Sequence, residues 1–312
     1  MVDLRVKIGR MKLKNPIMPA SGTFSEGLAR VFSFNHLGAM VTKTITAELR
    51  GGNPTPRVAE VGQGMLNSIG IPSKGVPYFI EHIMPEYERF SVPLVVSVSA
   101  PTVELFADIV RQLNLPGIAA IEANISCPNI EEDGKAFAMR PKSTAGVVEQ
   151  LRAATDLPLW VKLTPNTRDI AAVAVAAQNS GADALVVANT ILAMSIDTET
   201  FRPRLGSLMG GYSGPAIKPI VLRMVYQCAQ TVKIPIIGCG GISTIEDTVE
   251  YLLAGATAVQ VGTATFIKPN TMLDIVEGLE AFCERKGIGR VSELIGAVRD
   301  SGMKVDKLEA VP

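Results

Sequence analysis

Residues 233–263 read KIPIIGCGGISTIEDTVEYLLAGATAVQVGT and outline one strand–helix–strand unit. The short apolar runs Ile234–Gly238 and Ala258–Val261 predict two strands. Between them, over Thr244–Ala254, apolar residues recur at intervals of three and four, which predicts a helix. Two strands that a helix connects in this way lie parallel in one sheet, so this stretch predicts an α/β fold.

The same unit recurs along the chain. DLPLWVKL (156–163) has the proline-then-strand order of KIPIIGCG, and SGADALVV (180–187) has the Gly-Ala turn of AGATAVQV (254–261). Eight strands are predicted, at Ile17–Ala20, Ala39–Thr42, Leu94–Ser97, Ala119–Asn124, Leu159–Leu163, Ala184–Ala188, Ile234–Gly238 and Ala258–Val261. The predicted helices include Val103–Leu113, Thr144–Ala154, Ile170–Ser180, Ala216–Thr231 and Thr244–Ala254. Eight alternating units predict a (β/α)8 TIM barrel, with residues 1–312 as a single domain.

Three segments lie outside this repeat. Leu4–Ile8 and Met11–Leu13, joined by Gly9-Arg10, predict an N-terminal β-hairpin at the bottom of the barrel. Two long stretches, 43–93 and 189–213, each follow a predicted strand. They are therefore insertions at the C-terminal face, where the active sites of such barrels lie.

Composition excludes several classes of protein. The 312 residues are 47% apolar and carry 30 basic against 30 acidic side chains, which argues against disorder and against a nucleic-acid-binding surface. No apolar run is long enough to span a membrane, and the first residues lack a signal-peptide core, so we expect a cytoplasmic protein. The four cysteines form no CxxC pair and the two histidines are isolated, so no metal or iron–sulfur site is expected in this chain.

Glycine-rich loops follow the last two predicted strands. GCGGIS (238–243) and GTAT (262–265) each precede a predicted helix. Glycines let backbone N–H groups approach a ligand, a helix N-terminus favours an anion, and these two loops are the usual phosphate site of a barrel. We therefore expect a phosphate group here, although tight turns alone could explain glycines.

Two lysines lie at predicted strand ends. Lys43 follows AMVT, and Lys162 lies inside the apolar run LWVKL. A lysine buried in such a run needs a partner or a function. It could form a Schiff base, or it could place a positive charge beside a phosphate or a flavin. Alternatively, each ammonium could simply reach the rim of the barrel.

The segment NISCPN (124–129) ends the fourth predicted strand. Cys127 has no neighbouring histidine or aspartate, so it is a candidate general base rather than an activated nucleophile, or else a small buried residue. Cys228 falls in a helical pattern and Cys283 near a chain-terminal helix, so both are expected to be structural, whereas Cys239 in the glycine loop is expected near the ligand. Asparagines recur at the strand ends, and an amide suits a cyclic imide such as a pyrimidine. They are Asn67, Asn124, Asn129 and Asn189, the last followed by Thr190.

Taken together, eight motifs resemble class 1 dihydroorotate dehydrogenases. They are VTKTIT (41–46), GNPTPRVAE (52–60), MLNSIGI (65–71), NISCPN (124–129), VKLTPN (161–166), GGYSGPAIKP (210–219), GCGGIS (238–243) and AVQVGTA (258–264). They occur in the family order and cover most of the chain, and GGYSGPAIKP is most similar to the NAD-linked class 1B. The resemblance implies an FMN-binding barrel that oxidises (S)-dihydroorotate to orotate in pyrimidine synthesis.

The resemblance also assigns residue roles. Cys127 would take the C5 proton while hydride passes from C6 to the flavin, and Lys162 would stabilise the charge on the reduced flavin. The substrate would be held by Lys43, Asn67, Ser68, Ile69, Gly70, Ile71, Asn124, Asn129, Asn189 and Thr190. The FMN would be held by Ser21, Lys43, Thr44, Ser97, Asn124, Lys162, Ala188, Gly214, Gly240, Gly241, Gly262 and Thr263.

Some positions depart from the family pattern. Ser97 replaces a more frequent asparagine, Cys239 replaces a methionine, and the loop after Asn129 has Ala138 and Met139 where glycine and threonine are more usual. The chain also lacks a GxGxxG dinucleotide motif and clustered cysteines. The resemblance therefore implies a partner subunit with FAD and a [2Fe–2S] cluster, in a heterotetramer built on a homodimer of this chain.

Three alternatives stay open at this stage. A dihydropyrimidine dehydrogenase-like reductase is similar, but it usually has histidine where this chain has Asn129. A barrel lyase would form a Schiff base between Lys162 and a carbonyl substrate, and such a protein would be colourless. A non-catalytic protein that binds a phosphate ligand would turn over no substrate.

Overall fold

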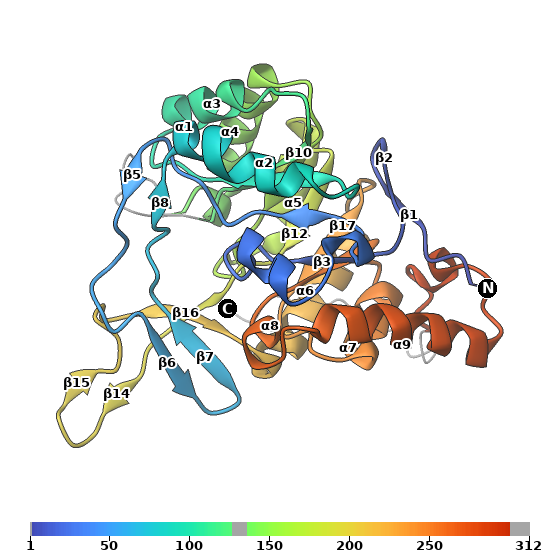
Figure 1. Ribbon diagram of the computed structural model, residues 1–312. Helices are drawn as coiled ribbons and strands as arrows, with labels where there is room; N and C mark the ends of the chain where they lie inside the picture. Colours follow the sequence, from blue (N-terminus) through green and yellow to red (C-terminus); the bar gives the residue numbers. More distant parts are fainter. Residues whose placement is uncertain (1, 127–135, 300–312) are drawn as a thin grey trace.

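The computed structural model describes residues 2–126 and 136–299, and its centre is an eight-stranded parallel sheet. In spatial order the strands are β3 (Ile17–Pro19), β18 (Ala258–Val261), β17 (Ile236–Cys239), β12 (Ala184–Val187), β11 (Leu159–Lys162), β10 (Ile118–Asn124), β9 (Leu94–Val98) and β4 (Met40–Val41). The N–H of Gly38 donates to the carbonyl oxygen of Ile17 at 2.8 Å, so the chain before β4 lies against β3 and the sheet closes on itself. The predicted TIM barrel is confirmed (Figure 1).

Helices surround the barrel because each has one apolar face to bury against it. They are α3 (Val103–Gln112), α4 (Pro141–Ala154), α5 (Ile170–Asn179), α6 (Lys218–Ala229), α7 (Ile245–Leu253) and α9 (Thr271–Lys286). Thr102, Asp169 and Thr244 cap three of them by accepting from an N–H of the first turn. These starts agree with the predicted helices to within a few residues.

The predicted strand Ile234–Gly238 begins two residues late, at Ile236. Pro235 has no N–H to donate to a neighbouring strand. The N–H of Ile234 donates instead to Oε1 of Gln178 at 3.2 Å, which holds it outside the ladder.

The N-terminal hairpin lies where the sequence predicts it. Strands β1 (Val6–Ile8) and β2 (Met11–Leu13) pair antiparallel and alternate between buried and exposed side chains. Nη2 of Arg10 in its turn donates to the carbonyl oxygen of Asp156, just before β11, at 2.6 Å. The hairpin therefore covers the amino ends of the barrel strands.

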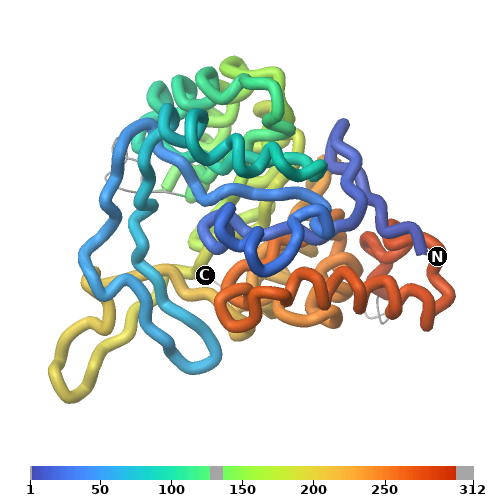
Figure 2. The backbone as a smooth tube through the Cα atoms, viewed as in Figure 1, coloured from blue at the N-terminus to red at the C-terminus, as the bar shows by residue number. Residues whose placement is uncertain are grey.

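The two long insertions form a second sheet above the opposite end of the barrel. Its order is β13 (Ile191–Ala193), β16 (Gly210–Ser213), β7 (Gly64–Asn67) and β6 (Val58–Val61). The pairing of Gly211 with Asn67 joins segments that are far apart in the sequence. The tube in Figure 2 shows the segment between β13 and β16 extending away from the barrel.

The remaining elements are short. The other strands are β5 (Leu49–Arg50), β8 (Ser73–Lys74), β14 (Ile196–Asp197) and β15 (Arg202–Pro203). The other helical turns are η1 (Glu26–Arg30), η2 (Phe34–His36), α1 (Val76–Tyr78), η3 (Phe79–Ile83), α2 (Met84–Glu88), η5 (Phe137–Met139), η6 (Pro215–Ile217), α8 (Ala264–Ile267) and η7 (Val291–Leu294). Within the described residues, no helix is long and apolar enough to cross a membrane.

Candidate active site

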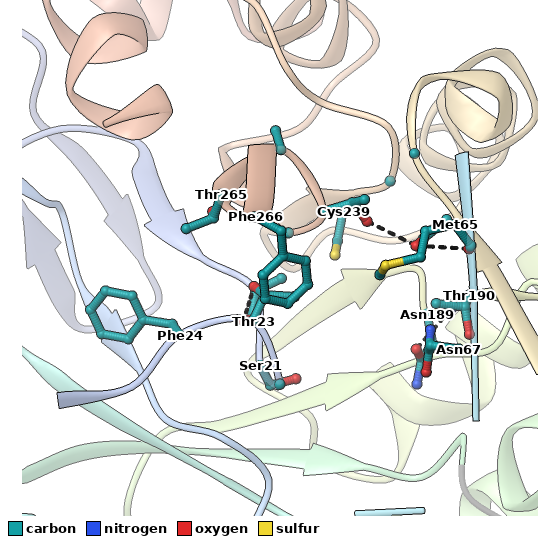
Figure 3. A pocket seen from close by; sticks show the side chains of 18 of the residues that line it. Ser21, Thr23, Phe24, Met65, Asn67, Asn189, Thr190, Cys239, Thr265 and Phe266 are labelled. Atoms are coloured by element: carbon teal, nitrogen blue, oxygen red, sulfur yellow. Dashed lines mark hydrogen bonds between the residues drawn. The ribbon is translucent and has the colours of Figure 1, made fainter. Parts of the chain in front are cut away.

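A cavity of about 620 Å³ lies at the carboxyl ends of the barrel strands, with both insertions contributing to its walls. Its described lining includes two lysines, Lys43 and Lys162, and no aspartate or glutamate. This charge pattern favours an anionic ligand. Figure 3 shows Ser21, Cys239 and Asn189 around the same space, although they follow or end three different strands.

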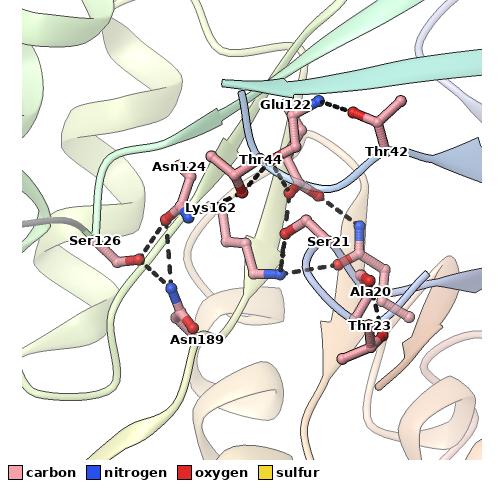
Figure 4. Close-up of polar contacts among 12 residues, drawn as sticks. Ala20, Ser21, Thr23, Thr42, Thr44, Glu122, Asn124, Ser126, Lys162 and Asn189 are labelled. Carbon is pink, nitrogen blue, oxygen red and sulfur yellow. Dashed lines mark hydrogen bonds and ion pairs between the residues drawn. The ribbon is translucent and has the colours of Figure 1, made fainter. Parts of the chain in front are cut away.

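Lys162, the last residue of β11, provides a buried positive charge in this lining. Its side chain is only 3% exposed. Its Nζ donates to Ser21 Oγ at 3.1 Å (Figure 4). It also donates to Gln260 Oε1 at 3.2 Å. Burial alone would lower the pKa of Lys162, but the nearby Glu122 carboxylate raises it above the usual value. The amine therefore stays protonated at neutral pH.

Ser97 lies behind the lining rather than in it. It is fully buried on β9, and its Oγ donates to Glu122 Oε1 at 3.0 Å. The same Oγ shares a 3.0 Å hydrogen bond with Oγ1 of Thr44, which does line the cavity. Among the predicted FMN contacts, the structure therefore places Ser97 one side chain away from the cavity.

The glycine loops close the cavity on the side of β17 and β18. Gly241 has a φ of +69°, and a Cβ there would lie 2.8 Å from the carbonyl oxygen of Gly214 and 2.9 Å from Cβ of Lys218. The glycine is thus required for close contact between two loops of the chain itself. Gly214, Gly240, Gly262 and Thr263 line the same cavity.

Thr265 in α8 adds a polar group that the prediction omits. Its Oγ1 is buried and has no hydrogen-bond partner in the part of the chain that the structure describes. The residue lines the cavity beside the glycine loops. Leaving such a hydroxyl unpaired costs about 1–3 kcal/mol, so this atom fits a ligand oxygen.

The N-terminus of α7 is already occupied by a carboxylate. Asp247 Oδ2 accepts from the N–H groups of Ser243 at 2.8 Å and Thr244 at 2.9 Å, while Oδ1 accepts from Lys218 Nζ at 2.8 Å. Burial would raise the pKa of Asp247, but Lys218 and these N–H groups hold it below its usual value. These two N–H groups of the helix N-terminus are therefore not available to an external anion, because Asp247 accepts from both.

A second cavity of about 260 Å³ adjoins the first and shares Asn67, Asn189 and Thr190 with it. Asn189 Nδ2 donates to Asn124 Oδ1 at 3.3 Å and also to Ser126 Oγ. The barrel and the second sheet thus bring together asparagines from three separate strand ends. Amides at a shared wall can recognise a ring with alternating donors and acceptors.

Asn166 is a further site residue that the prediction omits. Its Nδ2 donates to the carbonyl oxygen of Thr190 at 3.1 Å, and its Oδ1 accepts from the N–H of Leu192 at 2.8 Å. Asn166 therefore holds the chain that follows β12 against the second cavity. The motif VKLTPN contains this residue, but only the contacts show what it does.

Lys43 contributes the second positive charge of the first cavity. Burial lowers its pKa, and the nearby Arg57 lowers it further, against an opposing effect of Glu26. Its charge is therefore lost at a lower pH than that of a free lysine.

The structure thus brings together nearly all the predicted residues that it describes. The first cavity is lined by Ser21, Lys43, Thr44, Asn67, Ile69, Gly70, Ile71, Asn124, Lys162, Ala188, Asn189, Thr190, Gly214, Gly240, Gly241, Gly262 and Thr263, and the second by Ser68. Cys127 and Asn129 lie outside the described residues. Cys239 lines the first cavity as expected, whereas Cys228 and Cys283 are buried in helices. Within the described ranges, no group of three His, Cys, Asp or Glu side chains could hold a metal ion.

Comparison with known proteins agrees with this architecture. The family model described as dihydroorotate dehydrogenase matches residues 3–283. Curated relatives named "Dihydroorotate dehydrogenase B (NAD(+)), catalytic subunit" include proteins of Desulforudis audaxviator (45% identical, covering 96% of this chain and 99% of the relative) and Bacteroides fragilis (46%, covering 96% and 99%). One of Geotalea uraniireducens is 45% identical and covers 95% and 98%. The chain therefore belongs to the dihydroorotate dehydrogenase family, class 1B.

Proposed function

We infer that this chain oxidises (S)-dihydroorotate to orotate, as the catalytic subunit of a class 1B enzyme with NAD as the final electron acceptor. The observation that carries this inference is the pair of adjoining cavities with Lys43 and Lys162 as the charged residues of the larger one. The larger cavity has room for a cofactor, and the smaller one has asparagines in its wall. Family membership and the names of the relatives agree with this activity.

The residues of the larger cavity fit FMN. The unpaired Oγ1 of Thr265 and the loops of Gly240–Gly241 and Gly262–Thr263 would hold the phosphate. Lys162 and Asn124 would lie against the ring system. When bound there, FMN would supply the acceptor for a hydride from C6 of the substrate.

The chain's own residues would bind and orient the substrate. Asn67, Asn124, Asn189 and Thr190 would hold the pyrimidine ring and its carboxylate, and Lys43 would add a positive charge beside them. The three asparagine side chains come from different elements. Their relative positions are therefore fixed by the tertiary structure rather than by the conformation of one loop. We propose Cys127 as the base that takes the proton from C5, since the thiolate form of a correctly placed cysteine can accept a proton and become the thiol.

The partner is also part of the proposal. The sequence has no recognised dinucleotide-binding motif, so NAD would be bound by a second subunit that carries FAD and a [2Fe–2S] cluster. We propose a homodimer of this chain within a heterotetramer, located in the cytoplasm. Residues 1–312 would act as one FMN-binding domain.

Absorption spectroscopy of the purified chain tests this function. We expect a yellow protein with one flavin per chain, whose flavin band is bleached anaerobically by dihydroorotate and not by dihydrouracil. Bleaching by dihydrouracil instead would favour the dihydropyrimidine dehydrogenase alternative. A colourless protein that borohydride traps with a carbonyl substrate would favour the lyase.

A further inference from the structure

A buried carboxylate lies below the site, on a residue that lines neither cavity. Glu122 lies in the middle of β10 and is fully buried. Its Oε1 accepts from Ser97 Oγ at 3.0 Å and lies 4.0 Å from Lys162 Nζ. Its Oε2 accepts from Gln260 Nε2 at 2.6 Å. Removing a partner of a buried carboxylate is costly, because a charge is left without compensation. Glu122 also has no access to a ligand, since it lines neither cavity.

Gln260 on β18 connects Glu122 to Lys162. Its amide nitrogen donates to Glu122, and its amide oxygen accepts from the Lys162 ammonium at 3.2 Å. The two contacts together assign one orientation to the amide. In the reverse orientation, the amide oxygen would meet the carboxylate oxygen and the amide nitrogen would meet the ammonium, so neither hydrogen bond could form. Three strands, β10, β11 and β18, therefore fix the position of a single amine.

Glu122 is also the only anion that faces the amine in the described part of the chain. The groups around Lys162 are Ser21 after β3, Gln260 on β18, Cys239 on β17 and Glu122 itself. Burial raises the pKa of the Cys239 thiol, so this group is neutral at physiological pH. Lys43, from the end of β4, lines the same cavity but is itself a cation.

We propose that Glu122, directly and through Gln260, is a positioning residue that keeps the Lys162 ammonium charged and aimed into the cofactor cavity. The proposal rests on the function inferred above, because Lys162 is useful only if a flavin lies over it. Without the carboxylate, the desolvated amine has no counter-charge and its neutral form is favoured. The loss would move the titration of Lys162 into an accessible pH range.

The test is a pH titration of the absorption spectrum of the oxidised protein-bound flavin, for wild type and Glu122→Gln. The ring system of oxidised flavin has no group that titrates between pH 6 and 9.5, so a spectral step in that range reports a nearby protein group. We expect an additional step in the variant, at an apparent pKa about 1–3 pH units below that of an ordinary lysine. The FMN dissociation constant should rise across the same step. The double variant Glu122→Gln/Lys162→Met should lack it.

Two further variants separate this role from a purely structural one. Ser97→Ala removes a hydrogen bond to the same carboxylate and leaves both charges, so it should lower the unfolding temperature and add no spectral step. Gln260→Met removes the bridge between Glu122 and Lys162 without removing the carboxylate, so it should give a smaller spectral step. If Glu122→Gln does not fold, Gln260→Met takes its place in the test. No additional step in either Glu122→Gln or Gln260→Met, or a step that persists in the double variant, would overturn the proposal. A wild-type protein without flavin would instead overturn the proposed function.

Discussion

Asn189 and Asn124, which follow β12 and end β10, are hydrogen-bonded to each other across β11, with Asn189 Nδ2 donating to Asn124 Oδ1 at 3.3 Å. Each amide therefore constrains the direction in which the other can meet a ligand. A ligand that uses one of them depends on both.

Replacement of Asn189 should weaken substrate binding. We expect Asn189→Leu to weaken orotate binding about 10–100-fold, since a hydrogen bond to a charged ligand contributes about 1.5–3 kcal/mol. Titration of the flavin spectrum with orotate measures this effect. In a double-mutant cycle with Asn124→Leu, the two losses should be less than additive because the residues contact each other. Full additivity would mean that the contact between the amides does not affect binding.

Cys127 should control flavin reduction but not cofactor binding. Removal of a general base slows proton transfer about 10²–10⁴-fold. We expect Cys127→Ser and Cys127→Ala to retain FMN and orotate binding and to be reduced by dihydroorotate that much more slowly in stopped-flow experiments at neutral pH. Reduction of Cys127→Ala at nearly the wild-type rate would show that another group takes the C5 proton.

Thr265→Val should separate cofactor binding from folding. The substitution keeps the shape of the side chain and removes a buried hydroxyl without a described partner. The apoprotein should therefore unfold at the same temperature as wild type or higher, while FMN affinity falls about 10-fold or more. Calorimetry of the apoprotein and fluorescence titration with FMN measure the two effects. Unchanged FMN affinity would place the phosphate elsewhere.

Orotate binding should weaken at alkaline pH because of Lys43. Burial lowers the pKa of this lysine below 10.5. Its positive charge is present below that pKa and is lost as the pH rises through it, so affinity for the orotate carboxylate should fall in that direction. Lys43→Met should bind weakly at every pH and lack this decrease. A wild-type affinity that is constant up to pH 10.5 would contradict the role.

Electron transfer to NAD should require a second polypeptide. With dihydroorotate, we expect the isolated chain to reduce an artificial dye or oxygen and to reduce NAD poorly or not at all. Addition of an FAD and iron–sulfur subunit should restore NAD reduction. If the single chain reduced NAD at the dye-linked rate, the partner requirement would be wrong. Efficient reduction of fumarate would point to class 1A.

Gly241 illustrates why a correct residue can be predicted for an incomplete reason. The sequence predicts a glycine that lets the backbone approach a phosphate. The structure shows that a Cβ there would first meet Gly214 and Lys218 of the chain itself. Gly241→Val is therefore a poor probe of the phosphate site, because it disturbs the local fold.

The sequence by itself determined the barrel and most of its lining. Apolar runs of strand length and helical periodicity are local patterns, and the order β–α–β makes neighbouring strands parallel. Since parallel strands end at one face, the residues that end or follow Met40–Val41, Leu159–Lys162 and Ala184–Val187 had to meet there. That is why Lys43, Lys162 and Asn189 were predictable site residues.

Only the tertiary structure decided the contacts between distant segments. The pairing of β7 with β16 joins two segments that look like loops in the sequence into one sheet. Neither segment has a sequence pattern that predicts its pairing partner. Likewise, Glu122 appears in the sequence as one charge within an apolar strand, and Gln260 as one amide within another. Their bridge to Lys162 exists because barrel closure places β10, β11 and β18 around a common interior, where an unpaired charge would be too costly to bury.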